Sequence, residues 1–143
     1  MPNEKYLFLD FDGVLHPSLC RPQDYFGQIR LLEAALRDAQ VVIVISSSWR
    51  FHHDLTALLK HFPASLRDRV RGCTGDPVAG AHAKWHEIRQ YRERHGGMGD
   101  HWRALDDSAF EFPRGCAELV LCNAAVGMTE REGEVLRRWA LGG

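Results

Sequence analysis

The sequence predicts an α/β domain with a mainly parallel sheet, and two observations carry this prediction. Short apolar segments alternate along the chain with stretches whose hydrophobic residues recur at the helical period, which is typical of parallel sheets covered by helices. The segment Val41–Ile45 (VVIVI) contains only β-branched residues, which indicates a strand buried on both faces. A chain of 143 residues has room for one domain of ordinary size, so we expect a single domain over residues 1–143.

The first half of the chain is expected to contain two strands, a flap and a helix. The apolar run in Lys5–Asp10 (KYLFLD) predicts a buried strand. Residues 13–27 contain two prolines and two glycines, which favour an irregular flap. Apolar residues then recur near period 3.6 over Gln28–Ala39, and this spacing predicts an amphipathic helix before the strand Val41–Ile45.

The second half continues the alternation with shorter strands. We expect, in order, a helix after the serine run 46–48 that ends at Pro63, a weaker strand at Val70–Thr74, a helix at about Ala81–His95, short strands at His101–Asp106 and Leu119–Cys122, and a last helix. The sequence Thr129-x-x-Glu132 is a capping box, which opens that last helix.

Composition and charge narrow the class of protein. The longest apolar run has five residues, whereas a membrane span needs about twenty, so we expect neither membrane insertion nor export. The four cysteines form no C-x-x-C pair, so we expect reduced thiols in a cytoplasmic protein. Residues 49–103 carry ten basic and six acidic side chains, a net +4, which fits either an anionic ligand or a solvated basic face.

Polar side chains gather where the predicted strands end. Because the carboxyl ends of parallel strands meet at one edge of a sheet, we expect these side chains to lie close together. Several carboxylates this close repel one another and need a cation, and a hard divalent ion such as Mg²⁺ prefers oxygen ligands of this kind. The residues concerned are Asp10, Asp12, Ser46, Lys84, Asp106 and Asp107.

This combination of groups predicts chemistry on a phosphate. Asp10 is placed to attack phosphorus once a metal ion and Lys84 neutralise the phosphoryl oxygens. Asp12, two residues further on, can protonate the leaving alkoxide and then activate water. The serine hydroxyl and the N–H groups of the following helix can donate to phosphate oxygens, with Ser46 preferred and Ser47 left open because the end of the strand is uncertain by a residue.

The ordered motifs DFDGVLH, VVIVISSS, the helix lysine and LDD resemble the four motifs of the haloacid dehalogenase (HAD) superfamily of phosphohydrolases. The resemblance covers roughly Lys5 to Ser108 and implies a three-layer Rossmann-like fold with helices on both faces of the sheet. It implies that Asp10 is the nucleophile and Asp12 the acid/base, with the main-chain carbonyl of Asp12 on Mg²⁺. Asp106 would bind the metal directly, and Asp107 directly or through water.

The finer match is to HAD domains linked to nucleic-acid end repair. In line with it, we expect Mg²⁺-dependent phosphomonoester hydrolysis, with phosphorylated nucleic-acid ends or nucleotides as substrates. The flap has fifteen residues, Gly13–Gly27, and only six residues separate Thr74 from Ala81, so neither place can hold a cap domain. We expect basic side chains to attract a polyanion and aromatic side chains to stack on its bases. The basic residues are Arg50, Arg67, Arg69, Arg71, Arg89, Arg92 and Arg94, and the aromatic residues are Tyr25, Phe26 and Trp49.

Several alternatives stay open at this point. Arg50 fits either a second phosphate contact or a salt bridge, and the flap residues His16 and Arg21 either touch substrate or do not. The protein could instead be a non-catalytic HAD-fold binding module, or a sugar-phosphate phosphatase capped by oligomerisation, and the sequence does not set the oligomeric state. A receiver domain of two-component signalling shares these residue types, but its acidic pair comes first in the chain, whereas here Asp106-Asp107 comes last.

Overall fold

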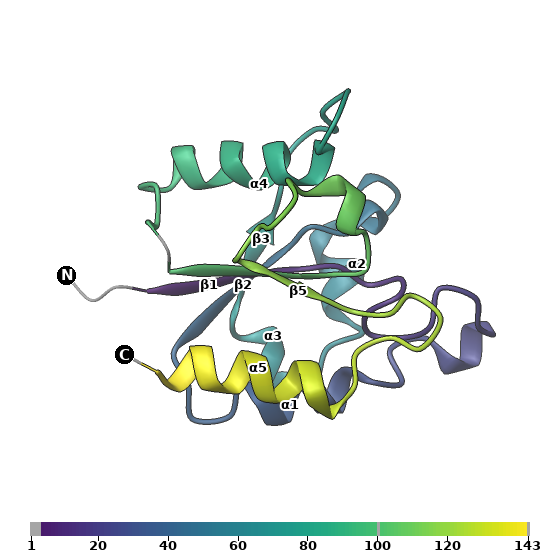
Figure 1. Ribbon diagram of the computed structural model, residues 1–143. Coiled ribbons are helices and arrows are strands. Elements are labelled where there is room, and N and C mark those ends of the chain that lie inside the picture. The colour runs from purple at the N-terminus through teal and green to yellow at the C-terminus, as the bar shows by residue number, and fades with distance from the viewer. Residues whose placement is uncertain (1–3, 100, 143) are drawn as a thin grey trace.

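The computed structural model describes residues 4–99 and 101–142. Its five strands form one all-parallel sheet in the order β3-β2-β1-β4-β5, which confirms the predicted parallel sheet (Figure 1). The strands are β1 (Lys5–Leu9), β2 (Val41–Ile45), β3 (Val70–Cys73), β4 (Trp102–Asp106) and β5 (Leu119–Leu121).

Helices cover both faces of this sheet and complete a three-layer α/β fold. In Figure 1, α4 (Ala83–Arg94) lies above the sheet, while α1 (Ile29–Ala35) and α5 (Glu130–Leu141) lie side by side below it. The short helices α2 (Leu55–Leu59) and α3 (Ala64–Arg67) connect β2 to β3; α2 contacts β3, and each helix buries one leucine on the face covered by α1 and α5. Among the described residues, no helix has the length and apolar character needed to cross a membrane.

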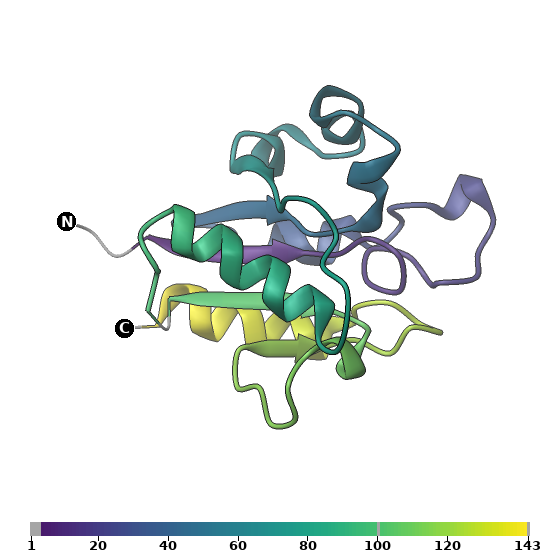
Figure 2. The same ribbon diagram turned by 90° about the horizontal axis from the view of Figure 1, so that it is seen from above.

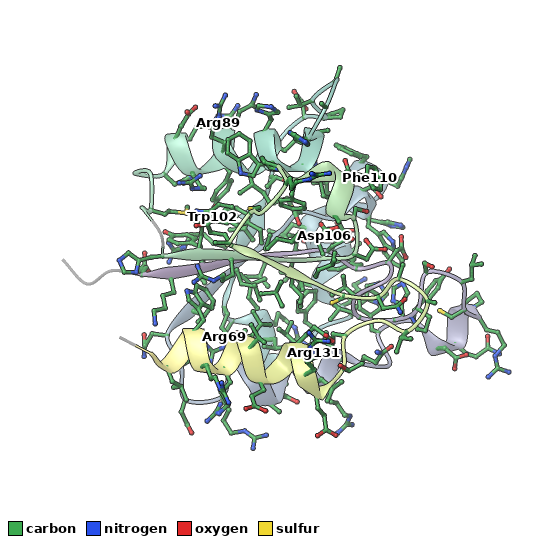
Figure 3. All side chains as sticks on the ribbon, viewed as in Figure 1. Arg69, Arg89, Trp102, Asp106, Phe110 and Arg131 are labelled. Carbon is green, nitrogen blue, oxygen red and sulfur yellow. The ribbon has the colours of Figure 1, made fainter. Side chains whose placement is uncertain are left out.

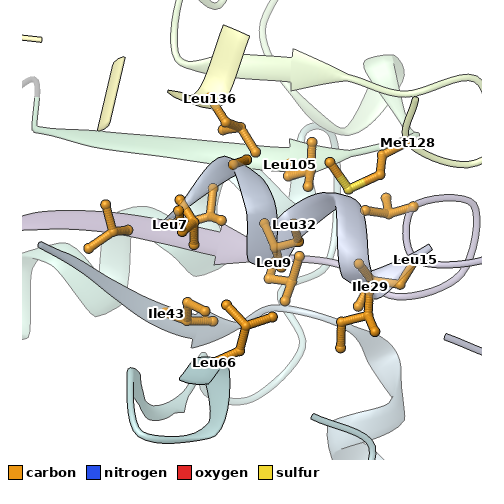
Figure 4. Close-up of a cluster of buried hydrophobic side chains, with 14 of the residues drawn as sticks. Leu7, Leu9, Leu15, Ile29, Leu32, Ile43, Leu66, Leu105, Met128 and Leu136 are labelled. Carbon is orange, nitrogen blue, oxygen red and sulfur yellow. The ribbon is translucent and has the colours of Figure 1, made fainter. Parts of the chain in front are cut away.

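The core is divided between the two faces of the sheet, as the continuous apolar strands predict. Ile43 and Ile45 pack into the cluster that faces α1 and α5, where Figure 4 shows Ile43 near Leu66 and Leu7 near Leu136. Val42 and Val44 point to the other face and pack with side chains of α4. Each strand therefore contributes alternate residues to two separate clusters, which fixes the face on which the residue after each strand lies.

The predicted helix after the serine run is wrong, because the segment is broken into three pieces. A 3₁₀ helix at Ser48–Phe51 is followed by α2, and Pro63 then opens α3 instead of simply ending a helix. Asp54 accepts a hydrogen bond from the Ala57 N–H and so starts a new helix in the middle of the apparent period.

Several predicted strand boundaries shift by one residue and two helix boundaries by more, whereas the capping box is confirmed. The first helix ends at Ala35 rather than Ala39. Helix α4 starts at Ala83 because His82 adopts a left-handed conformation with φ of 57°. The Thr129 side chain accepts a hydrogen bond from the Arg131 N–H, and the Glu132 carboxylate accepts one from the Thr129 N–H.

The flap is compact and fastened to a loop near the end of the chain, so no cap domain is present over the described residues. Figure 2 shows it as the purple-blue loop that extends beyond the carboxyl ends of the strands. The Met128 N–H donates to the Val14 carbonyl at 2.7 Å, and the Ser18 N–H donates to the Ala124 carbonyl at 2.8 Å. The Gln28 side chain also donates to the Met128 carbonyl at 2.6 Å.

Candidate active site

Four polar residues form a row along the carboxyl edge of the sheet, which we call the sheet-edge row: Thr74, Ser46, Asp10 and Asp106. The strand register places them in this order: Thr74, Ser46 and Asp10 directly follow β3, β2 and β1, and Asp106 is the last residue of β4. The backbone N–H groups of Thr74, Ser46 and Asp10 each donate to a carbonyl of the neighbouring strand at 2.8–3.1 Å. By the alternation of side chains along each strand, all four lie on the face covered by α4.

Lys84, in the first turn of α4, reaches down onto this row. Its Nζ lies 2.6 Å from Asp106 Oδ2 and 3.2 Å from Asp10 Oδ1, and its side chain is only 11% exposed. The second oxygen of Asp106 accepts a hydrogen bond from the Ser108 N–H at 3.0 Å, so this carboxylate is held on both sides. Figure 3 shows Asp106 at the carboxyl end of the sheet, beneath the turn that carries Phe110. The structure thus brings the predicted lysine and two predicted carboxylates together.

Burial dominates the electrostatics of these groups. Burial, assisted by the carboxylates of Asp106 and Asp107, raises the pKa of Asp10 to about 8 against the opposing attraction of Lys84. Burial likewise raises the pKa of Asp106. The ammonium of Lys84 is also desolvated, but the two carboxylates outweigh that penalty and raise its pKa above the ordinary value. One lysine therefore does not fully compensate the negative charge of this edge.

A third carboxylate completes a set of oxygen atoms that suits a metal ion. Asp10, Asp106 and Asp107 each offer one oxygen, and the three oxygens lie within 4.8 Å of one another. An all-oxygen set with an uncompensated negative charge fits Mg²⁺. Gly13 allows this approach: its φ is +75°, and a Cβ there would lie 2.1 Å from Asp107 Oδ2. The Asp12 carboxylate is outside this set, and its predicted contribution is the main-chain carbonyl.

Two hydroxyl groups of the sheet-edge row are buried without a hydrogen-bond partner among the described residues: Ser46 Oγ and Thr74 Oγ1. Ser47 Oγ instead accepts a hydrogen bond from the Trp49 N–H at 3.1 Å and caps the 3₁₀ helix. Of the two predicted serines, Ser46 is therefore the one with hydrogen-bonding capacity left for a ligand. Sequence reasoning missed Thr74, because its place in the row depends on the register between β2 and β3.

Arg50 connects the turn after β2 to the turn after β3 and to α4. Its hydrogen bonds argue against the predicted phosphate contact. Its guanidinium donates to the carbonyls of Ser46, Ser47 and Gly75 and to the Glu87 carboxylate, at 2.9–3.1 Å. These contacts use all five N–H groups, and both members of the Arg50–Glu87 pair are under 10% exposed. Glu87, missed in the sequence, also accepts a hydrogen bond from the Val78 N–H and so ties α4 to this turn.

The flap supplies the surroundings of Asp12. The Asp12 carboxylate accepts hydrogen bonds from the rings of His16 and Trp49, at 2.7 and 3.0 Å. His16 is fully buried, which sequence reasoning left open. Arg21 lies on the outside of the flap, where it pairs with Asp24 at 3.0 Å.

The predicted basic side chains of residues 49–103 do not form a continuous basic surface along this edge. Most of them contact the chain itself: Arg67 and Arg69 donate to backbone carbonyls, Arg71 pairs with Glu4, Arg89 with Glu93, and Arg92 donates to the Gly99 carbonyl. Phe26 is buried, so it is also unavailable for stacking, whereas Tyr25 is 40% exposed. The predicted electrostatic attraction of a polyanion by these arginines is thus not supported by their positions.

A parallel three-layer domain with these motifs, in this order along the chain, is a domain of the HAD class. Over residues 6–132 the chain matches the family described as the HAD domain in Swiss Army Knife RNA repair proteins, and it belongs to this family. Membership indicates a hydrolase of the phosphoesterase type and a link to RNA repair. Comparisons with the curated proteins and with the solved structures found no match.

Proposed function

We propose that the protein is a Mg²⁺-dependent phosphomonoesterase that works through an aspartyl-phosphate on Asp10. The observation that carries this proposal is the sheet-edge row itself. The buried carboxylate of Asp10 can act as a nucleophile, and Lys84 pairs with it. The adjacent Ser46 hydroxyl has no hydrogen-bond partner among the described residues and can donate to a phosphoryl oxygen.

Each residue then has one task in the reaction. An oxygen of Asp10 attacks phosphorus, and the bond from phosphorus to the ester oxygen breaks. Asp12 protonates the leaving alkoxide and then takes a proton from the water that cleaves the acyl-phosphate, which releases inorganic phosphate and restores Asp10. Lys84 and the Ser46 hydroxyl hold the phosphoryl oxygens.

Mg²⁺, when bound, supplies positive charge at the phosphoryl oxygens. Asp10, Asp106 and Asp107 would hold it, together with the main-chain carbonyl of Asp12. A bound cation also favours the ionised form of Asp10, whose pKa burial raises. The carboxylate that must attack is therefore kept deprotonated in the loaded protein.

For the substrate, we propose a terminal phosphate of RNA or another nucleic acid. The family match supports this choice, and so does the uncapped edge of the sheet. The partly exposed ring of Tyr25 packs against Trp49 at 5.4 Å, beside Asp12, where the base of a terminal nucleotide could stack.

The experiment is a screen of phosphomonoesters with and without Mg²⁺: an aryl phosphate, 5′- and 3′-phosphorylated oligonucleotides, mononucleotides and sugar phosphates. We expect hydrolysis only with Mg²⁺ and the highest kcat/KM on oligonucleotide ends. Tyr25→Leu should lower kcat/KM for oligonucleotides much more than for the aryl phosphate.

Each part of the proposal can fail separately in this screen. No hydrolysis of any phosphate would exclude the phosphomonoesterase. A preference for sugar phosphates, with oligonucleotides no better than mononucleotides, would retain the reaction but exclude the nucleic-acid substrate and favour a site capped by oligomerisation.

A further inference from the structure

Asp12 differs from the other carboxylates of the site because its contacts come from ring N–H groups of the flap and of the turn after β2. His16 Nε2 lies 2.7 Å from Asp12 Oδ1, and Trp49 Nε1 lies 3.0 Å from Asp12 Oδ2. Each carboxylate oxygen thus has one nitrogen partner. The Asp12 side chain is nevertheless 48% exposed, so its remaining lone pairs are open to a substrate or water.

The surroundings of His16 decide which of its ring nitrogens carries the proton. The Phe26 backbone N–H donates to His16 Nδ1 at 3.1 Å, so Nδ1 must be an acceptor. In the neutral ring the hydrogen is then on Nε2, and it points at Asp12. The ring is fully buried between Tyr25 and Phe26, with centroids 4.7 and 5.3 Å away, so it has little freedom to turn.

Trp49 holds the other oxygen with similar rigidity. An indole N–H can only donate, so its contact with Asp12 has one possible direction. The ring packs edge-on against Phe11 and Phe26, with centroids 5.6 and 5.3 Å away, and the Trp49 backbone N–H is bound by Ser47 Oγ. The orientation of Asp12 is therefore coupled to the turn that presents Ser46.

We propose that His16 and Trp49 are positioning residues that hold the Asp12 carboxylate in the orientation from which it exchanges protons with the leaving group and with water. This inference rests on the proposed phosphomonoesterase function. Neither ring needs to touch the substrate, because two fixed donors already set the plane of the carboxylate. Loss of either ring N–H would displace the Asp12 carboxylate, and the rate of proton transfer is sensitive to small displacements of the catalytic group.

The role predicts a dependence on the leaving group. An alkoxide is a strong base and needs a proton as the ester bond breaks, whereas an activated aryl oxide leaves with little help. A misplaced Asp12 should therefore impair alkyl phosphates more than aryl phosphates. The parameter to compare is kcat/KM, because it reports the step in which the leaving group departs and excludes later hydrolysis of the acyl-phosphate.

The variants are His16→Leu, His16→Gln and Trp49→Phe. We expect His16→Leu to lower kcat/KM for an alkyl phosphate about a hundredfold, the lower scale of acid/base catalysis, and for an activated aryl phosphate several times less. His16→Gln keeps an amide N–H near the position of Nε2 and should restore much of the loss. Trp49→Phe removes only the indole N–H from a retained ring and should show the same leaving-group pattern more weakly.

His61→Leu is the matched control. The His61 ring stacks on Phe26 at 4.3 Å and contacts Trp49 at 5.8 Å, but its described contacts do not include Asp12. It should lower kcat/KM for both substrates equally or not at all. Equal losses on both leaving groups in His16→Leu and Trp49→Phe, or the same selective loss in His61→Leu, would overturn the proposal.

A second measurement does not depend on turnover. Nitrogen NMR of the free protein should find His16 as the tautomer with hydrogen on Nε2, and hydrogen on Nδ1 would also overturn the proposal. If His16→Leu fails to fold, His16→Gln and Trp49→Phe carry the kinetic test. A wild-type protein that hydrolyses neither phosphate refutes the proposed function, whereas an active wild type without leaving-group selectivity in these variants refutes only the positioning role.

Discussion

The amino ends and the carboxyl ends of the parallel strands form two opposite edges of the sheet. These two edges differ in how completely their polar groups are paired. At the amino edge, cations are matched to backbone carbonyls: Lys5 Nζ lies 2.6 Å from the carbonyls of Trp139 and Gly142, at the end of α5. Arg69 similarly donates to the Leu36 carbonyl at the end of α1, at 2.9 Å. A surface hollow of about 680 Å³ lies there, lined by Arg69, Arg71 and Glu4 among others, yet Arg71 pairs with Glu4 and Arg69 donates to backbone carbonyls.

The carboxyl edge is the reverse of this arrangement. Of the three clustered carboxylates, Asp10 and Asp106 pair with Lys84, and two buried hydroxyls have no partner among the described residues. A stable fold can contain clustered carboxylates and unpaired buried hydroxyls at a site where a ligand supplies the missing charge and hydrogen bonds. Incomplete pairing, more than the size of a hollow, therefore distinguishes the candidate functional edge from the opposite one.

The largest expected effect is the loss of activity in Asp10→Asn. An amide cannot attack phosphorus, so aryl phosphate hydrolysis with Mg²⁺ should fall by about a thousandfold or more, to background. The rate is measured by release of the aryl alcohol, with circular dichroism as the control for folding. Wild-type activity in this variant would remove Asp10 as the nucleophile.

Metal binding should stabilise the carboxyl edge selectively. Mg²⁺ at a hundred times its Kd should raise the free energy of unfolding by about 2.7 kcal/mol, because it binds only the folded state. Differential scanning fluorimetry should show the rise in Tm for the wild type and little rise for Asp106→Asn. An equal Mg²⁺ affinity of both proteins by calorimetry would place the metal elsewhere.

The carboxyl edge should also make the metal-free protein less stable as the pH rises. Burial raises the pKa of Asp10 from 3.8 to about 8, so between these values the folded state holds a proton that the unfolded state has lost. The free energy of unfolding should therefore fall as the pH rises through this window. Urea titrations at pH 5 and pH 8 measure the fall, which Mg²⁺ or Asp10→Asn should reduce. An unchanged slope in Asp10→Asn would contradict this assignment.

At the amino edge, Arg69→Met should affect stability alone. Removing the guanidinium takes one of two donors from the Leu36 carbonyl and the Arg69 donor from the Ala39 carbonyl, which costs about 1–3 kcal/mol. Urea denaturation should detect this loss, while kcat/KM for the aryl phosphate stays at the wild-type value. A large fall in kcat/KM of a folded Arg69→Met protein would break the separation between the two edges.

The smallest effect tests the unpartnered hydroxyls. Thr74→Val keeps the shape of the side chain and removes a buried hydroxyl without a partner, so it should raise the free energy of unfolding by up to about 1 kcal/mol. Ser47→Ala is the matched comparison, because its hydroxyl caps the 3₁₀ helix and its loss should cost on the order of 1 kcal/mol. If Thr74→Val destabilises the protein as much as Ser47→Ala does, the Thr74 hydroxyl has a partner in solution.

The parts of the molecule that the sequence predicts are those set by short-range pattern. The β-branched run in β2 identified a buried strand, and the rule that parallel strands end at one edge brought Asp10 and Asp106 together. The broken helix after the serine run was not predicted, because Asp54 and Pro63 start new helices within an apolar period that appears continuous.

The contacts that the sequence could not predict join residues that no short-range pattern relates. Whether Arg50 binds a ligand or braces the edge depends on Glu87, which is 37 residues away. The role of His16 depends on a backbone N–H, that of Phe26, which no residue pattern encodes. Both depend on tertiary packing, and both lie beside residues whose chemistry the motifs did predict.

The fastening of the flap to loop 123–128 has a consequence for the order of folding. Gln28 and Met128, which meet there, are 100 residues apart in the chain. Closing so large a ring carries an entropy penalty that is recovered only after the intervening strands have paired. Asp10, the proposed nucleophile, can therefore be set by β1 and its neighbours early, whereas Asp12, the proposed acid/base, gains the support of the flap residue His16 in the last steps. A nascent chain that stops before residue 123 would carry all four motifs but lack the loop that fastens the flap.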